Sequence, residues 1–290
     1  MPDNTVPLIQ EITTANGTKV HISPQPEKPL LFLLRMASGD MGIWDANWEY
    51  LCRYFSVAHF SLKMPSIPEM SDARLMFKRL AQDCLDVAQS LDANQFHILG
   101  WTGGAHVALC CAADFPEHVG SMTLVAPFFR LADSRPLSVA TEFMRVLMQH
   151  GGRGLYSYYW FMAGFSPEFV RSQFNEIENW VDARLKRDQF MQSDPEKAIR
   201  WIQVLRTFSL ADAELEKIAA PALIIGPGLD TAYIGPNSEM ARALHDRIPC
   251  SELAITPDYG SLMMLEAPQV FQSISRSFFE RVSKRNNVPK

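Results

Sequence analysis

The sequence lacks several features that would place it in a broad class of proteins. No stretch approaches the roughly 18 consecutive apolar residues that a membrane-spanning helix needs. Lys and Arg number 27 against 32 Asp and Glu, and no basic run occurs. This balance argues against nucleic acid or an anionic membrane as a partner. The first ten residues carry neither a basic region nor an apolar core, so we expect no secretory signal.

Cysteine is also scarce, and its pattern indicates neither disulfides nor metal ligands. The chain has five cysteines, an odd number, at positions 52, 84, 110, 111 and 250. Their spacing matches no zinc-binding arrangement. We therefore expect reduced, mostly buried thiols in a cytoplasmic protein, with no metal and no cofactor.

What remains is a composition of 47% hydrophobic and 20% charged residues over 290 positions, which is typical of a globular protein. The continuous apolar run Leu30–Leu34 indicates a strand that is buried on both faces. Similar runs at 55–60, 96–99 and 121–125 alternate with helical patterns, one of which we expect Ser71 to cap. A hairpin turning at Asn16-Gly17 precedes them. This order predicts an α/β fold with a mostly parallel central sheet and flanking helices.

The pattern changes after Pro127 and changes back near Ala219. We divide the chain into a first part of the core (1–127), a helical cap or lid (128–219) and a second part of the core (220–290). Segments 139–149, 155–165, 168–186 and 196–208 have helical patterns, with a break expected at Gly151-Gly152. Their many aromatic and methionine side chains either form the core of a helical layer or line a pocket for an apolar ligand, and both can hold at once.

The stretch Gly100-Trp101-Thr102-Gly103-Gly104 follows an apolar strand and precedes an apolar helical pattern. It resembles the nucleophile elbow of the α/β-hydrolase family, and the resemblance extends from about Leu30 to Phe279. It implies an α/β-hydrolase fold with a helical cap inserted after the sixth strand. The central residue departs from the family, because Thr102 stands where a serine is usual.

The resemblance also implies a triad, and two further positions decide how much of it is kept. Ser261 stands where the family has its histidine, and a serine has no usable basicity near neutral pH. Losing that histidine costs on the order of 10⁶ in turnover in a well-studied protease. Asp230 matches the acid position, although a loop-capping role for it stays open, as does a purely local hydrogen bond for the Thr102 hydroxyl.

The oxyanion region is altered as well. We assign oxyanion or ligand binding to Arg35, Met36, Ala37, Trp101 and Gly103. Arg35 and Met36 stand where the family usually has His-Gly. The backbone N–H groups of Ala37 and Gly103 are the expected oxyanion donors. The charge of Arg35 suits an anionic head group, and the alternative is an ion pair with an aspartate at position 40 or 230.

Positions that the fold needs match the family, whereas positions that hydrolysis needs do not. Two functions therefore stay open. One is the binding of a small, largely apolar ligand with or without an anionic head, without ordinary Ser-His-Asp hydrolysis. The other is an enzyme with altered chemistry in the same pocket, such as cyclisation, elimination, isomerisation or acyl transfer, or an esterase or thioesterase that uses Thr102. Among the histidines, His59 is the remaining candidate base. The aromatic-rich cap is also a candidate homodimer interface.

Overall fold

The computed structural model describes residues 8–15, 17–35, 42–62, 66, 68–127, 135–187, 196, 199–200, 203–204, 207–229 and 237–285. Within these residues the centre of the molecule is an eight-stranded sheet in the order β1-β2-β4-β3-β5-β6-β7-β8. The strands are β1 (Gln10–Thr13), β2 (Lys19–Ser23), β3 (Leu30–Leu34), β4 (Ser56–Phe60), β5 (Phe96–Trp101), β6 (Val119–Val125), β7 (Ala222–Pro227) and β8 (Ser251–Thr256).

The six strands from β4 to β8 along this order are parallel, and the β1–β2 hairpin is antiparallel. Every residue of β3, β4 and β5 is buried, as expected for strands covered on both faces. Gly17 has φ +82° in the hairpin turn, which is a conformation that glycine adopts without strain. The structure thus confirms the parallel α/β sheet and its N-terminal hairpin.

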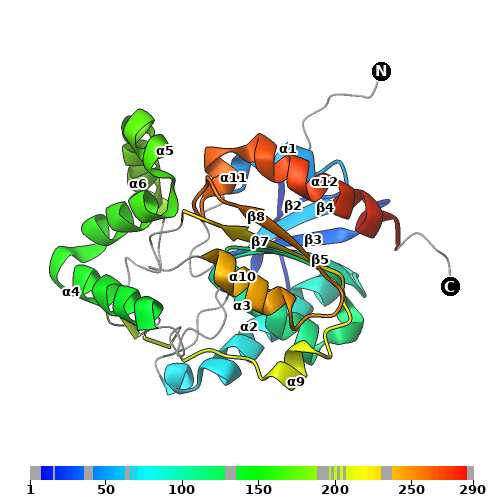
Figure 1. Cartoon of the computed structure of the whole chain (residues 1–290). Coiled ribbons are helices and arrows are strands. Elements are labelled where there is room, and N and C mark those ends of the chain that lie inside the picture. Colours follow the sequence, from blue (N-terminus) through cyan, green and yellow to red (C-terminus); the bar gives the residue numbers. More distant parts are fainter. Residues whose placement is uncertain are drawn as a thin grey trace.

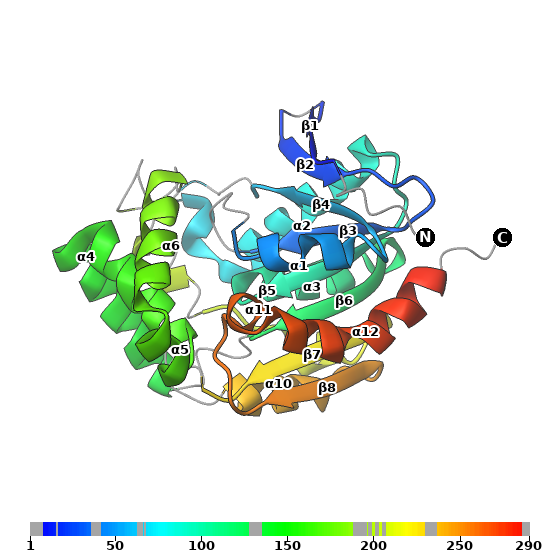
Figure 2. The ribbon, with the colours of Figure 1, turned by 90° about the horizontal axis from the view of Figure 1, so that it is seen from above.

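Helices cover both faces of the sheet (Figures 1 and 2). One face packs through residues such as Phe32 and Ile98 against α2 (Ala73–Ser90), α3 (Gly103–Asp114), α9 (Asp212–Leu215) and α10 (Asn237–His245). The other face packs through Leu33 and Leu99 against α1 (Asp45–Leu51), α11 (Met263–Glu266) and α12 (Pro268–Arg285). Short 3₁₀ turns lie at Pro68–Ser71 and Pro116–His118.

The capping residue of α2 differs from the expected one. The Oδ1 atom of Asp72 accepts a hydrogen bond from the Leu75 backbone N–H at 3.0 Å, so Asp72 is the N-cap. Ser71 instead ends the preceding 3₁₀ turn. Both side chains can cap a helix, and the turn before α2 decided which one is in place.

A group of three helices lies between β6 and β7 in the chain and beside one end of the sheet, on the left of Figure 1. We call α4 (Arg135–Gly164), α5 (Pro167–Ser172) and α6 (Phe174–Arg187) the helical insertion. The two helices expected at 139–149 and 155–165 are one kinked helix, with the expected break retained as Gly152 at φ +66°. The segment expected at 168–186 is split into α5 and α6 at Gln173. That 128–219 forms one cap stays a prediction.

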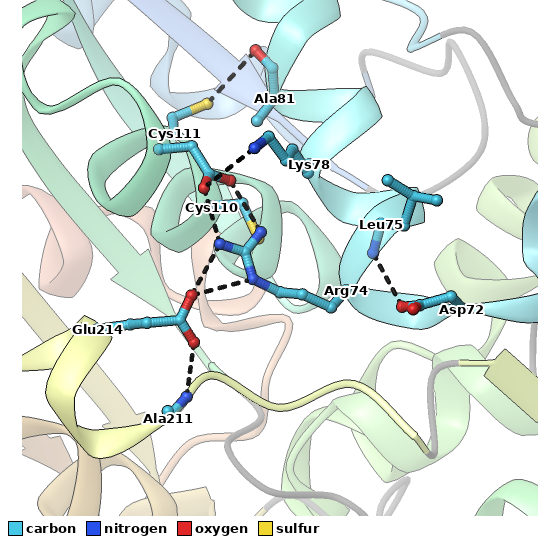
Figure 3. A network of polar contacts seen from close by, with 10 residues as sticks. Asp72, Arg74, Leu75, Lys78, Ala81, Cys110, Cys111, Ala211 and Glu214 are labelled. Carbon is cyan, nitrogen blue, oxygen red and sulfur yellow. Dashed lines mark hydrogen bonds and ion pairs between the residues drawn. The ribbon is translucent and has the colours of Figure 1, made fainter.

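An ionic network ties three helices together under the sheet (Figure 3). Both Nη atoms of Arg74 on α2 donate to Asp114 on α3 at 2.8 Å, and Nη2 also donates to Glu214 on α9 at 2.9 Å. The hydrogen bonds to Asp114 raise the pKa of the Arg74 guanidinium above its usual value. This side chain therefore stays charged and links helices that are distant in sequence.

Two features of composition can be compared with the structure. None of the helices in the described part of the chain is long and apolar enough to cross a membrane. All five cysteines are free thiols, four of them buried, and Cys250 is exposed. The expected mostly buried thiols are confirmed.

Candidate functional site

Thr102 lies at the sharp turn between β5 and α3, at φ +50° and ψ −114°. Its backbone N–H donates to the Val125 carbonyl at 2.9 Å, which anchors the turn to the neighbouring strand. A β-branched residue at positive φ is strained, at a cost on the order of 1–3 kcal/mol. The surrounding structure therefore holds Thr102 in a conformation that it would not adopt on its own.

Two glycines make this turn sterically feasible. A Cβ atom on Gly100 would lie 2.6 Å from the Gly104 carbonyl oxygen, and one on Gly104 would lie 2.5 Å from the Leu34 carbonyl carbon. Such distances are shorter than any real Cβ contact, and the atoms on the other side are backbone atoms that cannot move aside. Strand β5, helix α3 and the end of β3 thus approach so closely that only glycine fits at both positions.

Ser261 lies in the loop that follows β8, and it is 1% exposed. The indole Nε1–H of Trp101 donates to the Ser261 carbonyl at 2.6 Å, which joins this loop to the elbow. The Oγ atom of Ser261 is buried and has no hydrogen-bond partner among the residues that the structure describes. A buried polar atom without a partner costs about 1–3 kcal/mol, so this hydroxyl is an unsatisfied group next to the elbow.

The other expected site residues fall into two groups. Arg35 directly follows β3 and is 6% exposed, and its backbone nitrogen lies near the start of α3. Gly103 is the first residue of α3, where the backbone N–H has no acceptor within the helix, so it stays a candidate oxyanion donor. Met36, Ala37 and Asp230 lie outside the described residues, as does Asp40, and their roles stay predictions. The structure brings Arg35, Trp101, Thr102, Gly103 and Ser261 to the same end of the sheet.

No buried histidine of the described sheet strands or of α3 is placed to act as a base on Thr102. His97 on β5 contacts the Ser121 Oγ at 2.7 Å through Nδ1, and burial lowers its pKa to about 4. His106 on α3 stacks on Phe208 at 4.6 Å, within the core on the other face of the sheet.

The sheet register also separates His59 from Thr102. His59 on β4 pairs with Leu33, which pairs with Leu99. Two strand spacings make about 10 Å, and three further residues along β5 to Thr102 add about 10 Å more. Side chains of this size cannot span that separation with a direct hydrogen bond. The geometry therefore excludes His59 as a base that acts directly on Thr102.

A cavity of about 350 Å³ lies where the helical insertion meets the core. It is lined by Phe161 of α4, Trp180 and Ala183 of α6, Leu265 of α11, and Gly42, Ile43, Asp45 and Ala46 at the start of α1. Its lining is mostly apolar, and Phe165 stacks behind it, 5.5 Å from Trp180 and 6.2 Å from Phe161. This size and character suit a small apolar ligand.

Phe161 and Trp180 lie in the segments 155–165 and 168–186, whose aromatic side chains the sequence analysis already proposes for a core or a pocket. Sequence reasoning missed the residues of α1 and α11 because no local pattern shows which distant segments face the insertion.

The loop that carries Ser261 is also where the insertion is attached. The Leu262 N–H donates to the Gly164 carbonyl at 2.8 Å. The Ser166 backbone N–H donates to Glu266 Oε2 at 3.1 Å, and the Ser166 hydroxyl donates to Glu266 Oε1. A Cβ on Gly260 would lie 2.7 Å from the Gly164 carbonyl carbon, so the two backbones nearly touch. Sequence reasoning did not find these contacts; the one local signal was the glycine at 260.

Comparisons with known proteins agree with this geometry at the level of the fold. No family model matches the chain. A pimeloyl-[acyl-carrier protein] methyl ester esterase of Nitrosomonas europaea is 26% identical over 264 residues, which cover 88% of this chain and 97% of the relative. A pyrrolizixenacetamide deacetylase of Xenorhabdus hominickii is 24% identical over 259 residues, covering 86% and 90%.

A solved α/β-hydrolase enzyme from a Medee basin deep-sea metagenome library superposes with a TM-score of 0.75 at 17% identity, covering 93% of this chain and 97% of the other. The chain has the α/β-hydrolase fold. The hydrolases and esterases of the α/β-hydrolase fold that it resembles match it over most of its length. The strained elbow at Thr102 and its two glycines are the features of this fold that the chain keeps at the site.

Proposed function

We propose that this α/β-hydrolase-fold protein binds a small, largely apolar ligand between the helical insertion and the core, without Ser-His-Asp hydrolysis. The observation that carries the proposal is Ser261. It occupies the position that the histidine of a triad takes in the resemblance, it is buried, and its hydroxyl cannot take a proton from Thr102 near neutral pH. The two curated relatives are named for hydrolytic reactions. By this proposal the chain resembles them in fold but differs from them in chemistry.

The cavity supports the ligand class. Its walls are the aromatic rings of Phe161 and Trp180 and the aliphatic side chains of Ile43 and Leu265. Burying apolar ligand surface against such walls contributes about 25 cal/mol per Å². Arg35, buried at the same end of the sheet, places a permanent positive charge near the elbow, which favours an anionic head group.

One observation favours a second function, an esterase that uses Thr102. The elbow keeps the strained φ of +50° although the residue is β-branched, and backbone strain of this kind concentrates at functional sites. A hydroxyl at that turn, next to the first N–H groups of α3, retains part of the machinery for acyl transfer. The missing base is the reason we rank this function second.

A serine-reactive fluorophosphonate probe separates the two functions. We expect no labelling of the purified protein and no hydrolysis of p-nitrophenyl acyl esters above the buffer rate. Labelling that is present in the wild-type protein and abolished in Thr102→Ala would overturn the binding proposal in favour of the esterase.

Native mass spectrometry of the protein purified from its host tests ligand binding directly. We expect a bound small molecule that is released unchanged after incubation, and release of a converted molecule would contradict the proposal. Trp180→Ala removes a wall of the cavity and should lower ligand occupancy at least several-fold. Phe174→Ala is the matched control, because Phe174 is an exposed aromatic residue on the same helix outside the cavity lining.

A further inference from the structure

The cavity and the elbow are separate in this structure. The described lining of the cavity does not include Trp101, Thr102 or Ser261. Close to both lies the contact of the end of α4 and the turn that follows it with the loop before α11 and α11 itself. We call this contact the latch; it consists of Gly164 and Ser166 on the insertion and Gly260, Leu262 and Glu266 on the core.

The latch concentrates the polar attachment of the insertion to the core. Three hydrogen bonds between these two parts belong to it, one to Gly164 and two to Glu266. Glu266 accepts both the N–H and the O–H of Ser166, whose Oγ also caps α5 by accepting from the Phe169 N–H at 3.2 Å. The contact therefore depends strongly on one carboxylate.

The latch also closes over Ser261. A Cβ on Gly164 would lie 3.2 Å from the Ser261 Oγ, so the insertion backbone passes directly over this hydroxyl. The closed arrangement leaves that Oγ without a partner, a cost that an arriving ligand atom or water can remove. The closed latch is thus held by Glu266 and opposed by the unsatisfied hydroxyl.

On α4 and on α11, a residue that lines the cavity lies within one helical turn of a latch residue. Phe161 precedes Gly164 by three residues on α4, and Leu265 follows Leu262 by three residues around α11. Parting Gly164 from Leu262 would therefore also part the two segments that carry these lining residues, and it would uncover the Ser261 hydroxyl.

We propose that the latch is a gate held by Glu266, and that its opening joins the cavity to the elbow and offers the Ser261 hydroxyl to a polar group of the ligand. The ligand class rests on the proposed function, but the gate itself does not. In this arrangement Ser261 binds the ligand where the histidine of a triad would have acted as a base.

Access to position 261 can be measured without any ligand. In full-length protein carrying Cys250→Ser, which removes the exposed thiol, Ser261→Cys places a thiol at the closed position. We expect slow modification by N-ethylmaleimide, followed by intact-mass spectrometry. Adding Glu266→Gln or Ser166→Ala should speed the reaction at least about tenfold, because hydrogen bonds to a charged group are among the stronger ones. Glu280→Gln, an exposed carboxylate on α12, is the matched control and should leave the rate unchanged.

Rapid labelling with the latch intact, or equal rates in the latch variants and the control, would overturn the gate. Hydrogen exchange at the Leu262 amide, which is bonded to Gly164, gives the same information in a protein that retains Ser261. We expect Glu266→Gln to speed exchange there and to leave the central strand β5 protected; unchanged exchange at Leu262 would refute the proposal.

These readouts stay separate from the test of the proposed function. A protein that hydrolyses esters could still have the gate, and a binding protein could lack it. Once a bound molecule is identified, Ser261→Ala should weaken its binding several-fold if the hydroxyl contacts it, whereas unchanged binding would refute that contact.

Discussion

The strain at Thr102 gives a prediction of unusual direction, because removing a side chain there should stabilise the protein. Thr102→Ala and Thr102→Gly both delete the hydroxyl and the branched methyl group, and they differ only in the remaining Cβ atom. Strain from a Cβ atom at φ +50° and ψ −114° costs on the order of 1–3 kcal/mol. The greater chain entropy of glycine in the unfolded state offsets about 0.4–1 kcal/mol of this.

We therefore expect the Thr102→Gly variant to be about 1–2 kcal/mol more stable than the Thr102→Ala variant. For a chain of this size that corresponds to roughly 2–6 °C in Tm. Urea unfolding followed by tryptophan fluorescence, with thermal unfolding in parallel, measures the difference. If the glycine variant is no more stable than the alanine variant, the turn does not store the strain that its dihedral angles indicate.

The control for this comparison is an alanine-to-glycine change where the backbone is an ordinary helix. Ala112 is buried in α3. Replacing it by glycine should destabilise the protein by about 1 kcal/mol. The opposite signs at positions 102 and 112 would isolate backbone strain from every other effect of glycine.

Three further outcomes follow from the core. Gly104→Ala should prevent folding or lower the free energy of unfolding by at least about 3 kcal/mol, because the new Cβ would meet the Leu34 backbone. Soluble yield and the urea midpoint measure this loss. Gly154→Ala is the control and should be neutral or slightly stabilising, because a Cβ there has nothing within 4 Å. The pKa of His97 is about 4 in the folded protein and near 6.5 in the unfolded chain. The free energy of unfolding should therefore fall as the pH drops from 6.5 towards 4, by about 2 kcal/mol at pH 5. His97→Gln should remove this part of the pH dependence, as measured by urea unfolding. Arg74→Met should lower the unfolding free energy by about 1–3 kcal/mol, because the Asp114 side chain, which is 12% exposed, loses two hydrogen bonds from a charged donor.

Each of these has a result that would count against it. A folded Gly104→Ala protein with an unchanged urea midpoint would show that β3 and α3 can separate. Parallel pH profiles for the wild-type and His97→Gln proteins would mean that the imidazole is not desolvated. The Arg171–Glu168 pair is exposed on both sides, so Arg171→Met should have almost no effect. A loss at Arg74→Met that is no larger would show that the Arg74 network does not stabilise the fold.

The elements that local patterns specify most strongly were predicted well. The run Leu30–Leu34 is a buried parallel strand, and the runs expected at 96–99 and 121–125 lie within β5 and β6. These succeed because hydrophobic periodicity directly reflects which face of an element is buried. Helix boundaries were less certain, as with Ser71 and Asp72, because neighbouring side chains compete for the same cap.

The candidate site was predictable only in part. The spacing of Gly100, Thr102 and Gly104 located the elbow, because a Cβ atom at either glycine would clash with the backbone around this turn. The cavity walls from α1 and α11 were not predictable, because they come together only when the sheet and the insertion pack. The Ser166–Glu266 contact joins residues one hundred positions apart, and nothing in either local sequence indicates the other.

The sequence by itself determined the parallel sheet and the glycine spacing of the elbow, because these depend on side-chain type at fixed local spacing. The tertiary structure alone decided that the Gly164 backbone lies over Ser261, that the Ser261 hydroxyl has no partner among the described residues, and that Glu266 bonds to the insertion at Ser166. Contacts of this kind depend on where separate elements meet in space, and the free energy that selects the meeting point comes from burying the whole core.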